Sequence, residues 1–208
     1  MVPLTRITDS IYAQDDGKSV GNVGMIVTEA GNYLIDTSQY PVLARDIRKQ
    51  VESVGTGKIK GVFLTHTHFD HTGGMQHFAD VPSYAHAILD KNFRERYMRD
   101  EVVQRFLNRE DKEMFEDLSP TPPSKIFETN PYCPEDNEQI EMYRTGGHTN
   151  GSTFVYYRKE NVIFAGDNLF AGVFPWGGDK TSDGRRYEYR SRRYILLQHL
   201  PDTSGADY

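Results

Sequence analysis

The chain has 208 residues, of which 26% are charged, and its formal net charge is −6 at pH 7. This acidic balance and the lack of a basic arm argue against nucleic acid or an anionic membrane as a partner. The single cysteine, Cys133, excludes an internal disulfide and is typical of a reducing compartment. There is no signal-peptide pattern and no apolar run of membrane-spanning length, so the sequence predicts one cytoplasmic domain over residues 1–208.

The first sixty residues predict short strands followed by an amphipathic helix. Apolar residues form short runs bounded by turn residues, which is typical of strands. Strands are expected at residues 6–14, 22–29 and 32–36, with Ala30-Gly31-Asn32 as the hairpin that joins the last two. The helix is expected at residues 41–54, with Pro41 in its first turn and Val42, Ile47, Val51 and Val54 facing inward.

Residues 62–74 combine a buried strand with a cluster of metal-binding side chains. After the apolar run from Val62 to Leu64, four potential ligands follow within six residues: His66, His68, Asp70 and His71. Imidazole and carboxylate groups are costly to bury without a partner, and they are usual ligands of zinc and iron. The pattern therefore predicts a metal site on a loop whose extended backbone would point residues 66, 68 and 70 in the same direction. The pair Gly73-Gly74 would then let the backbone turn tightly.

The rest of the chain predicts a helical region and then further strands. A strand at residues 82–85 precedes a charged helical region at about 90–118, which is either a cover over the domain or a lid or partner surface beside the site. A proline-rich linker at residues 119–123 ends this region. Later elements are expected as strands at residues 138–144, 153–157 and 161–165, and as a last helix at 187–200. The loop at residues 169–179 either lines a substrate pocket or packs against the domain, through Phe170, Phe174 and Trp176.

Three motifs in this order, His66-x-His68-x-Asp70-His71, Gly147-His148-Thr149 and Gly166-Asp167, resemble the signature of the metallo-β-lactamase fold superfamily. The resemblance covers about residues 6–208. It implies an α/β fold, a four-layer αββα sandwich, with a helical insertion at about residues 90–118. Asp36 resembles an acidic residue that the family places near its metal ligands, and it either orients a histidine or caps a turn.

The resemblance also implies which side chains hold metal. His66, His68 and His148 would bind one ion, and Asp70 and His71 would bind a second. Asp167 would bridge the two ions. The expected cofactors are two divalent metal ions, with Zn²⁺ expected first and iron or manganese as alternatives. Asp70 would also be catalytic, because it would orient a water molecule or accept its proton.

The activity that the resemblance implies is hydrolysis of a small-molecule ester, thioester, lactone or related substrate by a metal-bound hydroxide. His71 makes the chain less similar to lactamases that place a cysteine in the second site. His68 stands where the flavin-linked di-iron oxygen reductases have glutamate, which argues against an oxygen-reducing member. Two alternatives stay open: a mononuclear-iron oxidoreductase of the sulfur dioxygenase type, and a non-catalytic scaffold that metal stabilises.

The family's last motif, a Gly-His pair after one more strand, is absent from this sequence. The chain ends just before the place expected for that motif, in what resembles a truncated last strand. His199, on the predicted last helix, is not expected to be a ligand, and neither are His77 and His86. Three explanations stay open. The chain is a piece of a longer protein, water or a neighbouring group completes the second site, or the protein uses one metal ion.

Overall fold

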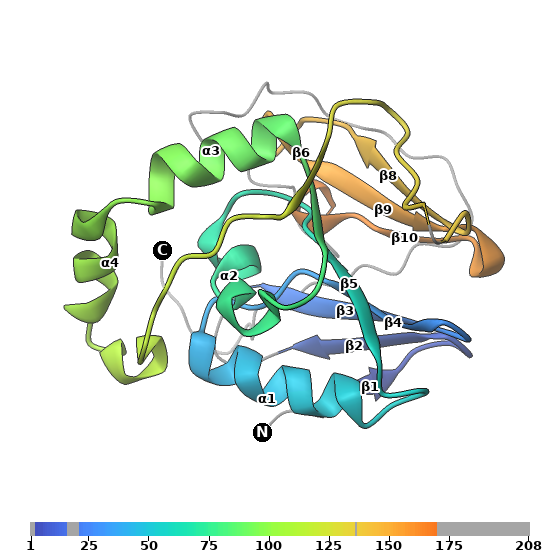
Figure 1. Cartoon of the computed structure of the whole chain (residues 1–208), viewed down its shortest axis with the longest axis horizontal. Helices are drawn as coiled ribbons and strands as arrows, with labels where there is room; N and C mark the ends of the chain where they lie inside the picture. Colours follow the sequence, from blue (N-terminus) through green and yellow to red (C-terminus); the bar gives the residue numbers. More distant parts are fainter. Residues whose placement is uncertain (1–2, 16–20, 136, 170–208) are drawn as a thin grey trace, which may run out of the picture.

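Two β-sheets pack face to face, and helices cover the outer face of the larger sheet (Figure 1). The structure is a computed structural model, and it describes residues 3–15, 21–135 and 137–169. The larger sheet consists of β1 (Thr5–Arg6), β2 (Ile11–Asp15), β3 (Asn22–Thr28), β4 (Gly31–Ile35), β5 (Ile59–Phe63), β6 (Ser83–His86) and β7 (Lys125–Phe127). The smaller sheet consists of β8 (Ile140–Arg144), β9 (Thr153–Tyr157) and β10 (Val162–Phe164).

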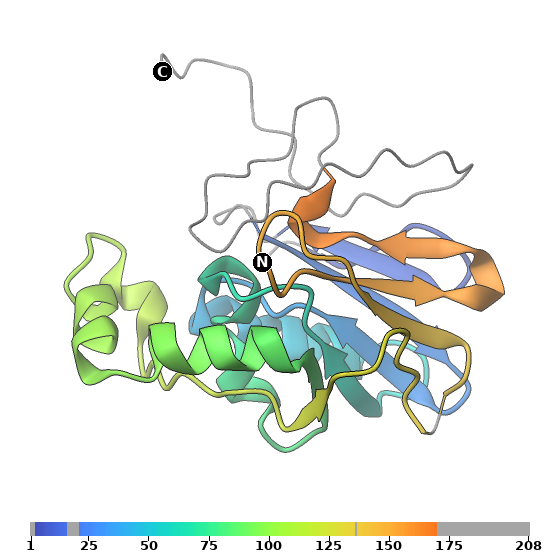
Figure 2. The same ribbon diagram turned by 90° about the horizontal axis from the view of Figure 1, so that it is seen from above.

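The helical segments lie between and after these strands. They are α1 (Pro41–Glu52), α2 (Phe69–Thr72), η1 (Met75–Phe78), α3 (Ala87–Tyr97), α4 (Asp100–Leu107), η2 (Lys112–Phe115), η3 (Arg158–Glu160) and η4 (Gly166–Asn168). Helices α1 and α3 lie on the side of the larger sheet that faces away from the smaller one, and α4 lies at one end of the molecule (Figure 2). Within the described ranges, every helix is too short or too polar to cross a membrane.

The order of strands in the larger sheet follows the chain and changes from antiparallel to parallel at β4. Strands β1 to β4 pair antiparallel, whereas β4 to β7 pair parallel. Parallel neighbours end at the same edge of a sheet. Because Ile35 of β4 lies opposite Phe63 of β5, the segments that begin with Asp36 and Leu64 leave this edge together. The sheet therefore brings two of the candidate loops side by side.

Apolar side chains fill two layers. Between the sheets, the buried rings of Tyr33 and Phe63 stack with their centroids 5.5 Å apart. The other buried members of this layer are Ile11, Ile26, Ile35, Tyr84, Phe127, Ile140, Met142, Val155, Tyr157, Val162 and Phe164. Between the larger sheet and its helices lie Val23, Met25, Leu34, Ala44, Ile47, Val51, Ile59, Val62, Leu64, Met75, Phe78, Ala85 and Leu89. This arrangement confirms the predicted α/β sandwich, and burial of each large side chain favours folding by about 1.5–3 kcal/mol.

A third cluster joins the predicted helical region to α2. This aromatic cluster consists of Tyr40, Phe69, Phe93, Tyr97, Phe106 and Phe115, with Val102 and Leu118 beside them. The ring of Phe69, the first residue of α2, stacks on Phe106 at 4.2 Å and lies 5.0 Å from Tyr97. The helices that follow β6 therefore pack directly against the segment that carries the candidate ligands.

The role predicted for Gly73 and Gly74 was wrong. Their φ angles are −63° and −86°, which other residues also adopt, so no tight turn requires glycine here. Their lack of a side chain serves close packing instead. A Cβ atom on Gly74 would lie 2.2 Å from the carbonyl oxygen of Thr37, and one on Gly73 would lie 2.1 Å from that of Gln39. The two glycines let this segment lie against the loop that follows β4.

Three other predictions need correction. The single strand predicted at residues 6–14 is two strands, because β1 ends at Arg6 and β2 begins at Ile11. The helix predicted at residues 41–54 ends at Glu52, and Val42 is only half-buried because the buried stripe runs through Ala44, Ile47 and Val51. Strand β7 was missed, since three residues with a single buried side chain leave little pattern. The predictions for residues 170–179, for the helix at 187–200, for His199 and for a truncated last strand lie outside the described residues.

Candidate metal centre

The loop after β5 carries the first two candidate ligands. His66 and His68 lie on an extended segment, and His68 occupies the position just before α2, with φ −61° and ψ 147°. Asp70 and His71 lie on the first turn of α2 rather than on the extended loop. The prediction that residues 66, 68 and 70 point in the same direction was therefore wrong in its premise, because a helical turn begins at Phe69 and changes the side-chain period from two residues to 3.6.

The first group of side chains contains three imidazoles and one carboxylate. Nδ1 of His68 lies 3.2 Å from Nε2 of His66 and 2.8 Å from Nε2 of His148. Oδ2 of Asp167 lies 3.4 Å from Nε2 of His148 and 3.9 Å from Nε2 of His66. Four possible ligand atoms thus converge on one point, although His148 is distant from the others in the sequence.

The second group shares Asp167 with the first. Nε2 of His71 lies 3.1 Å from Oδ1 of Asp167 and 3.4 Å from Oδ2 of Asp70. The two carboxylate oxygens of Asp167 therefore face different groups, Oδ2 the three imidazoles and Oδ1 the pair of Asp70 and His71. All six residues predicted to bind metal lie in these two groups.

The donor set and one buried atom suit divalent metal ions. Nε2 of His71 is buried and has no directed hydrogen-bond partner among the described residues, despite the nearby carboxylate oxygens. Leaving such an atom without a partner costs free energy unless something binds it. Imidazole nitrogens and carboxylate oxygens are the ligands that zinc and iron take in proteins. The residues present therefore fit divalent cations.

Burial and nearby charges shift the pKa values of two histidines in this cluster in opposite directions. Burial, reinforced by the nearby histidines, holds the pKa of His66 well below its usual range. Burial would also lower the pKa of His71, but the carboxylates of Asp167, Asp70 and Asp36 outweigh it and raise that pKa well above the usual range. A protonated His71 thus supplies positive charge among three acidic groups when no cation does. A cation bound here would replace that proton, because a histidine ligand must be neutral.

Asp36 contacts the Nδ1 atom of the His71 ring. Its Oδ2 accepts a hydrogen bond from Thr65 Oγ1 at 2.6 Å and lies 2.7 Å from Nδ1 of His71, while its Oδ1 accepts from the backbone N–H of Thr65 at 2.8 Å. With Nδ1 as the donor, the lone pair of Nε2 points away from Asp36 and toward the second group. The sequence left the choice between turn cap and histidine-orienting residue open, and these contacts favour the orienting role.

Replacing Asp36 with asparagine is expected to weaken metal binding at His71 by about 10- to 100-fold, because an amide NH₂ in place of Oδ2 would face the donors of His71 and Thr65 instead of accepting from them. Asparagine also tolerates the φ of +59° at this position, so backbone strain is not a competing cause. Zinc titration against a chelating dye would measure the change. If the variant binds zinc as tightly as the wild type does, Asp36 does not tune His71.

Asn168 is a functional candidate that the sequence analysis missed. It directly follows Asp167, and its Oδ1 accepts a hydrogen bond from the backbone N–H of His148 at 2.8 Å. The only signal in the sequence is its place beside Asp167. His77 and His86 lie outside both groups, as predicted, and His86 accepts a hydrogen bond from the backbone N–H of Ile88 at the start of α3.

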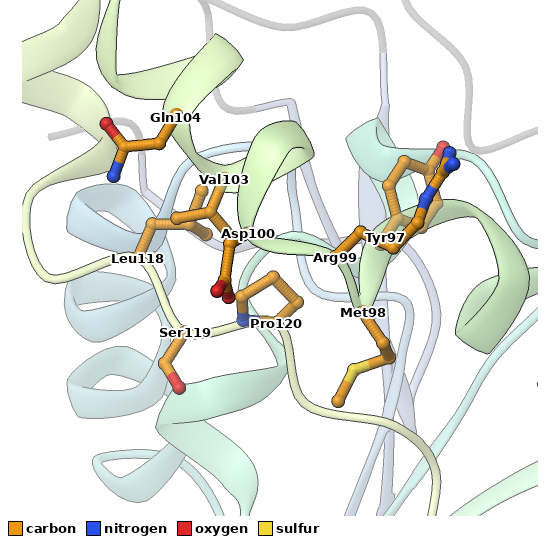
Figure 3. A pocket seen from close by; sticks show the side chains of 9 residues that line it. All are labelled: Tyr97, Met98, Arg99, Asp100, Val103, Gln104, Leu118, Ser119 and Pro120. Atoms are coloured by element: carbon orange, nitrogen blue, oxygen red, sulfur yellow. The ribbon is translucent and has the colours of Figure 1, made fainter.

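A separate hollow lies at the corner between α3 and α4 (Figure 3). It has a volume of about 420 Å³ and is lined by Tyr97, Met98, Arg99, Asp100, Val103, Gln104, Leu118, Ser119 and Pro120. Asp100 is the one acidic side chain in this lining, which includes no histidine or cysteine, so the hollow offers no set of metal ligands. It does share Tyr97 with the aromatic cluster that contacts Phe69.

Comparisons with known proteins agree with the geometry. A family model described as the metallo-beta-lactamase superfamily matches residues 16–202. The chain is 28% identical to the acyl-coenzyme A thioesterase MBLAC2 of Gallus gallus over 52% of its own length and 41% of the relative's. It is 32% identical to an uncharacterized protein of Aquifex aeolicus over 61% of its own length and 57% of the relative's. The chain therefore spans about half the length of these curated relatives.

Solved structures show the same fold at lower sequence identity. A metallo-beta-lactamase from Pontibacter korlensis is 20% identical and aligns with a TM-score of 0.65, covering 88% of this chain and 80% of that one. Because the identity is low, this likeness concerns the fold alone. The family model matches most of the chain, so the chain belongs to the metallo-beta-lactamase superfamily.

Proposed function

We propose that this protein is a hydrolase that binds two divalent metal ions, with Zn²⁺ as the first expectation, and cleaves a small ester, thioester or lactone. The observation that carries the proposal is the position of Asp167. Its two carboxylate oxygens face two different groups of ligand atoms, which is the arrangement a shared ligand needs.

Each proposed ligand is assigned to one of the two metal ions or to both. His66, His68 and His148 would hold one ion, Asp70 and His71 the other, and Asp167 both. When bound, such ions lower the pKa of a coordinated water and polarise a carbonyl oxygen of the substrate. The chain supplies ionised carboxylates for this purpose. Burial alone would raise the pKa values of Asp70 and Asp167, but the charge of His71 lowers both.

Asp70 is proposed to orient the attacking water. Its side chain keeps 16% of its surface exposed, compared with 3% for His71, so it lies on the accessible side of the centre. A general base works best with a pKa near the working pH, whereas the pKa of Asp70 is lowered. Accepting a hydrogen bond from water therefore suits Asp70 better than holding a proton between steps.

The substrate class is proposed from the chemistry and from one relative. Attack by water on a carbonyl carbon needs a leaving group, which esters, thioesters and lactones all supply. The relative named as an acyl-coenzyme A thioesterase supports testing acyl thioesters first. The two groups that share Asp167 favour two ions over one. The oxidoreductase and the metal-stabilised scaffold are the other outcomes that the test can distinguish.

Metal content and hydrolysis together test the proposal. The protein would be loaded with Zn²⁺ or Fe²⁺, dialysed, and analysed for metal, with acyl thioesters, aryl esters and lactones as substrates. Two equivalents of zinc are expected in the wild type, falling to one in His71→Ala, with activity lost after chelation and restored by zinc. His77→Ala, which changes a histidine outside both groups, should keep two equivalents and full activity.

Other results would overturn the proposal. One equivalent of iron that persists in His71→Ala and disappears in His148→Ala would indicate a mononuclear centre and direct the search to oxidation of thiols and persulfides. Tight binding of zinc without hydrolysis of any substrate class would favour the metal-stabilised scaffold. Absence of bound metal after loading would contradict both the hydrolase and the scaffold.

A further inference from the structure

Asn168 makes hydrogen bonds with both its acceptor and its donors inside the protein. It lies on η4, directly after Asp167, and only 7% of its surface is exposed. Its Oδ1 accepts from the backbone N–H of His148 at 2.8 Å. Its Nδ2 donates to Thr145 Oγ1 at 2.8 Å and to the carbonyl oxygen of Gly146 at 2.9 Å. One buried amide thus holds the segment that carries His148 at three points.

Backbone hydrogen bonds to Ser152 hold Thr145 and Gly146, at the start of the segment, and two glycines precede His148. Gly146 and Gly147 adopt φ values of +66° and +102°, and glycine has the largest conformational freedom to lose on ordering. Buried backbone N–H and C=O groups here also need partners. An asparagine supplies an acceptor and two donors from one short side chain, which neither aspartate nor leucine can do.

The position of Asn168 in the chain couples two candidate ligands. Asp167 and Asn168 belong to the same short turn, which begins at Gly166 with φ +51°. A Cβ atom on Gly166 would lie 2.6 Å from Thr65 Oγ1, so the turn packs closely against the segment that carries His66. From this fixed turn, Asp167 reaches Nε2 of His148 at 3.4 Å while Asn168 holds the backbone N–H of the same residue.

We propose that Asn168 is a positioning residue that fixes His148 relative to Asp167 and thereby sets the metal affinity of the three-histidine group without contacting the metal. The inference rests on the proposed metal-binding function. It differs from that function because it predicts a change in affinity and in coordination geometry from a residue whose amide oxygen and nitrogen bind His148, Thr145 and Gly146 instead.

The chain offers a matched control in the same loop, which joins β8 to β9. Asn92 on α3 donates to Asn150 Oδ1 at 2.6 Å, so it also ties this loop to the rest of the fold through one side-chain amide. Asn150 lies beyond His148, and Arg144 holds the carbonyl oxygen of Asn150 independently at 2.9 Å. Asn92→Ala therefore removes an asparagine contact of similar type without touching the backbone of His148.

The test compares Asn168→Ala, Asn168→Leu and Asn92→Ala with the wild type. Zinc affinity would be measured by competition with a chelating dye, and the Co²⁺-loaded proteins by visible ligand-field absorption. Both Asn168 variants are expected to bind the zinc equivalent that His71→Ala retains about 10- to 100-fold more weakly, with shifted cobalt bands. In metal-free protein, the backbone amide of His148 is expected to exchange with deuterium faster in Asn168→Ala. Asn92→Ala should match the wild type in the zinc and cobalt measurements.

Each other outcome counts against the inference. Unchanged zinc affinity and cobalt bands in a folded Asn168→Ala protein would contradict the positioning role while leaving the proposed function intact. The same loss in Asn92→Ala would show that general loosening of the segment, and not the contact to His148, is responsible. A wild type that binds neither zinc nor cobalt would overturn the proposed function and this inference together.

Discussion

Replacing Asp167 with alanine is expected to remove the second metal equivalent and to lower kcat/KM for hydrolysis by about 10³-fold, which corresponds to about 4 kcal/mol of transition-state stabilisation. The first group would keep His66, His68 and His148, and three protein ligands suffice for a catalytic zinc ion. The second group would keep only Asp70 and His71. The Asp167→Ala variant should therefore lose one bound metal ion rather than both.

Asp167→Asn separates the charge of Asp167 from its shape. Its amide NH₂ is not a metal ligand, so one of the two groups would lose its ligand atom while the side chain keeps nearly the same volume. Metal content and the zinc-induced rise in the thermal midpoint would be measured for both variants. Two tightly bound equivalents and wild-type turnover in either variant would show that Asp167 is not shared between metal ions.

The sequence predicted the elements better than the contacts between them. The apolar run before His66 indicated β5, and short apolar runs indicated β3, β4 and β9, because these strands are buried along most of their length. What the sequence could not supply is the register between strands. The approach of Asp36 to His71, which decides the role of Asp36, follows from the parallel pairing of β4 with β5.

The candidate ligands were grouped from the family resemblance rather than from their spacing. Spacing alone suggested an extended loop on which Asp70 points the same way as His66 and His68, whereas Asp70 reaches the same centre from the helical turn that begins at Phe69. Asn168 was missed because its partners, such as the backbone of His148, lie about twenty residues away in the sequence. Contacts of this kind depend on how loops meet at the edge of a sheet, and no local pattern encodes them.

Phe69→Ala is expected to lower the free energy of unfolding by about 3–5 kcal/mol, the usual cost of removing a buried phenylalanine ring. Phe69 is 7% exposed, and it stands between His68 and Asp70 in the chain. Its ring stacks on Phe106 and contacts Tyr97, so it joins the first turn of α2 to helices α3 and α4. Urea denaturation of the metal-free proteins would measure the loss.

The same variant tests whether the helical region supports the metal centre. Because Asp70 and His71 lie on the turn that Phe69 anchors, Phe69→Ala should also weaken the second metal equivalent, whereas Phe69→Leu should retain most of the affinity. Phe93→Ala is the matched control, since Phe93 is fully buried in the same cluster but lies on α3, away from the ligands. Comparable destabilisation with unchanged zinc affinity in Phe93→Ala would assign the effect to the anchored turn. Equal weakening in both variants would mean that the helices act only through overall stability.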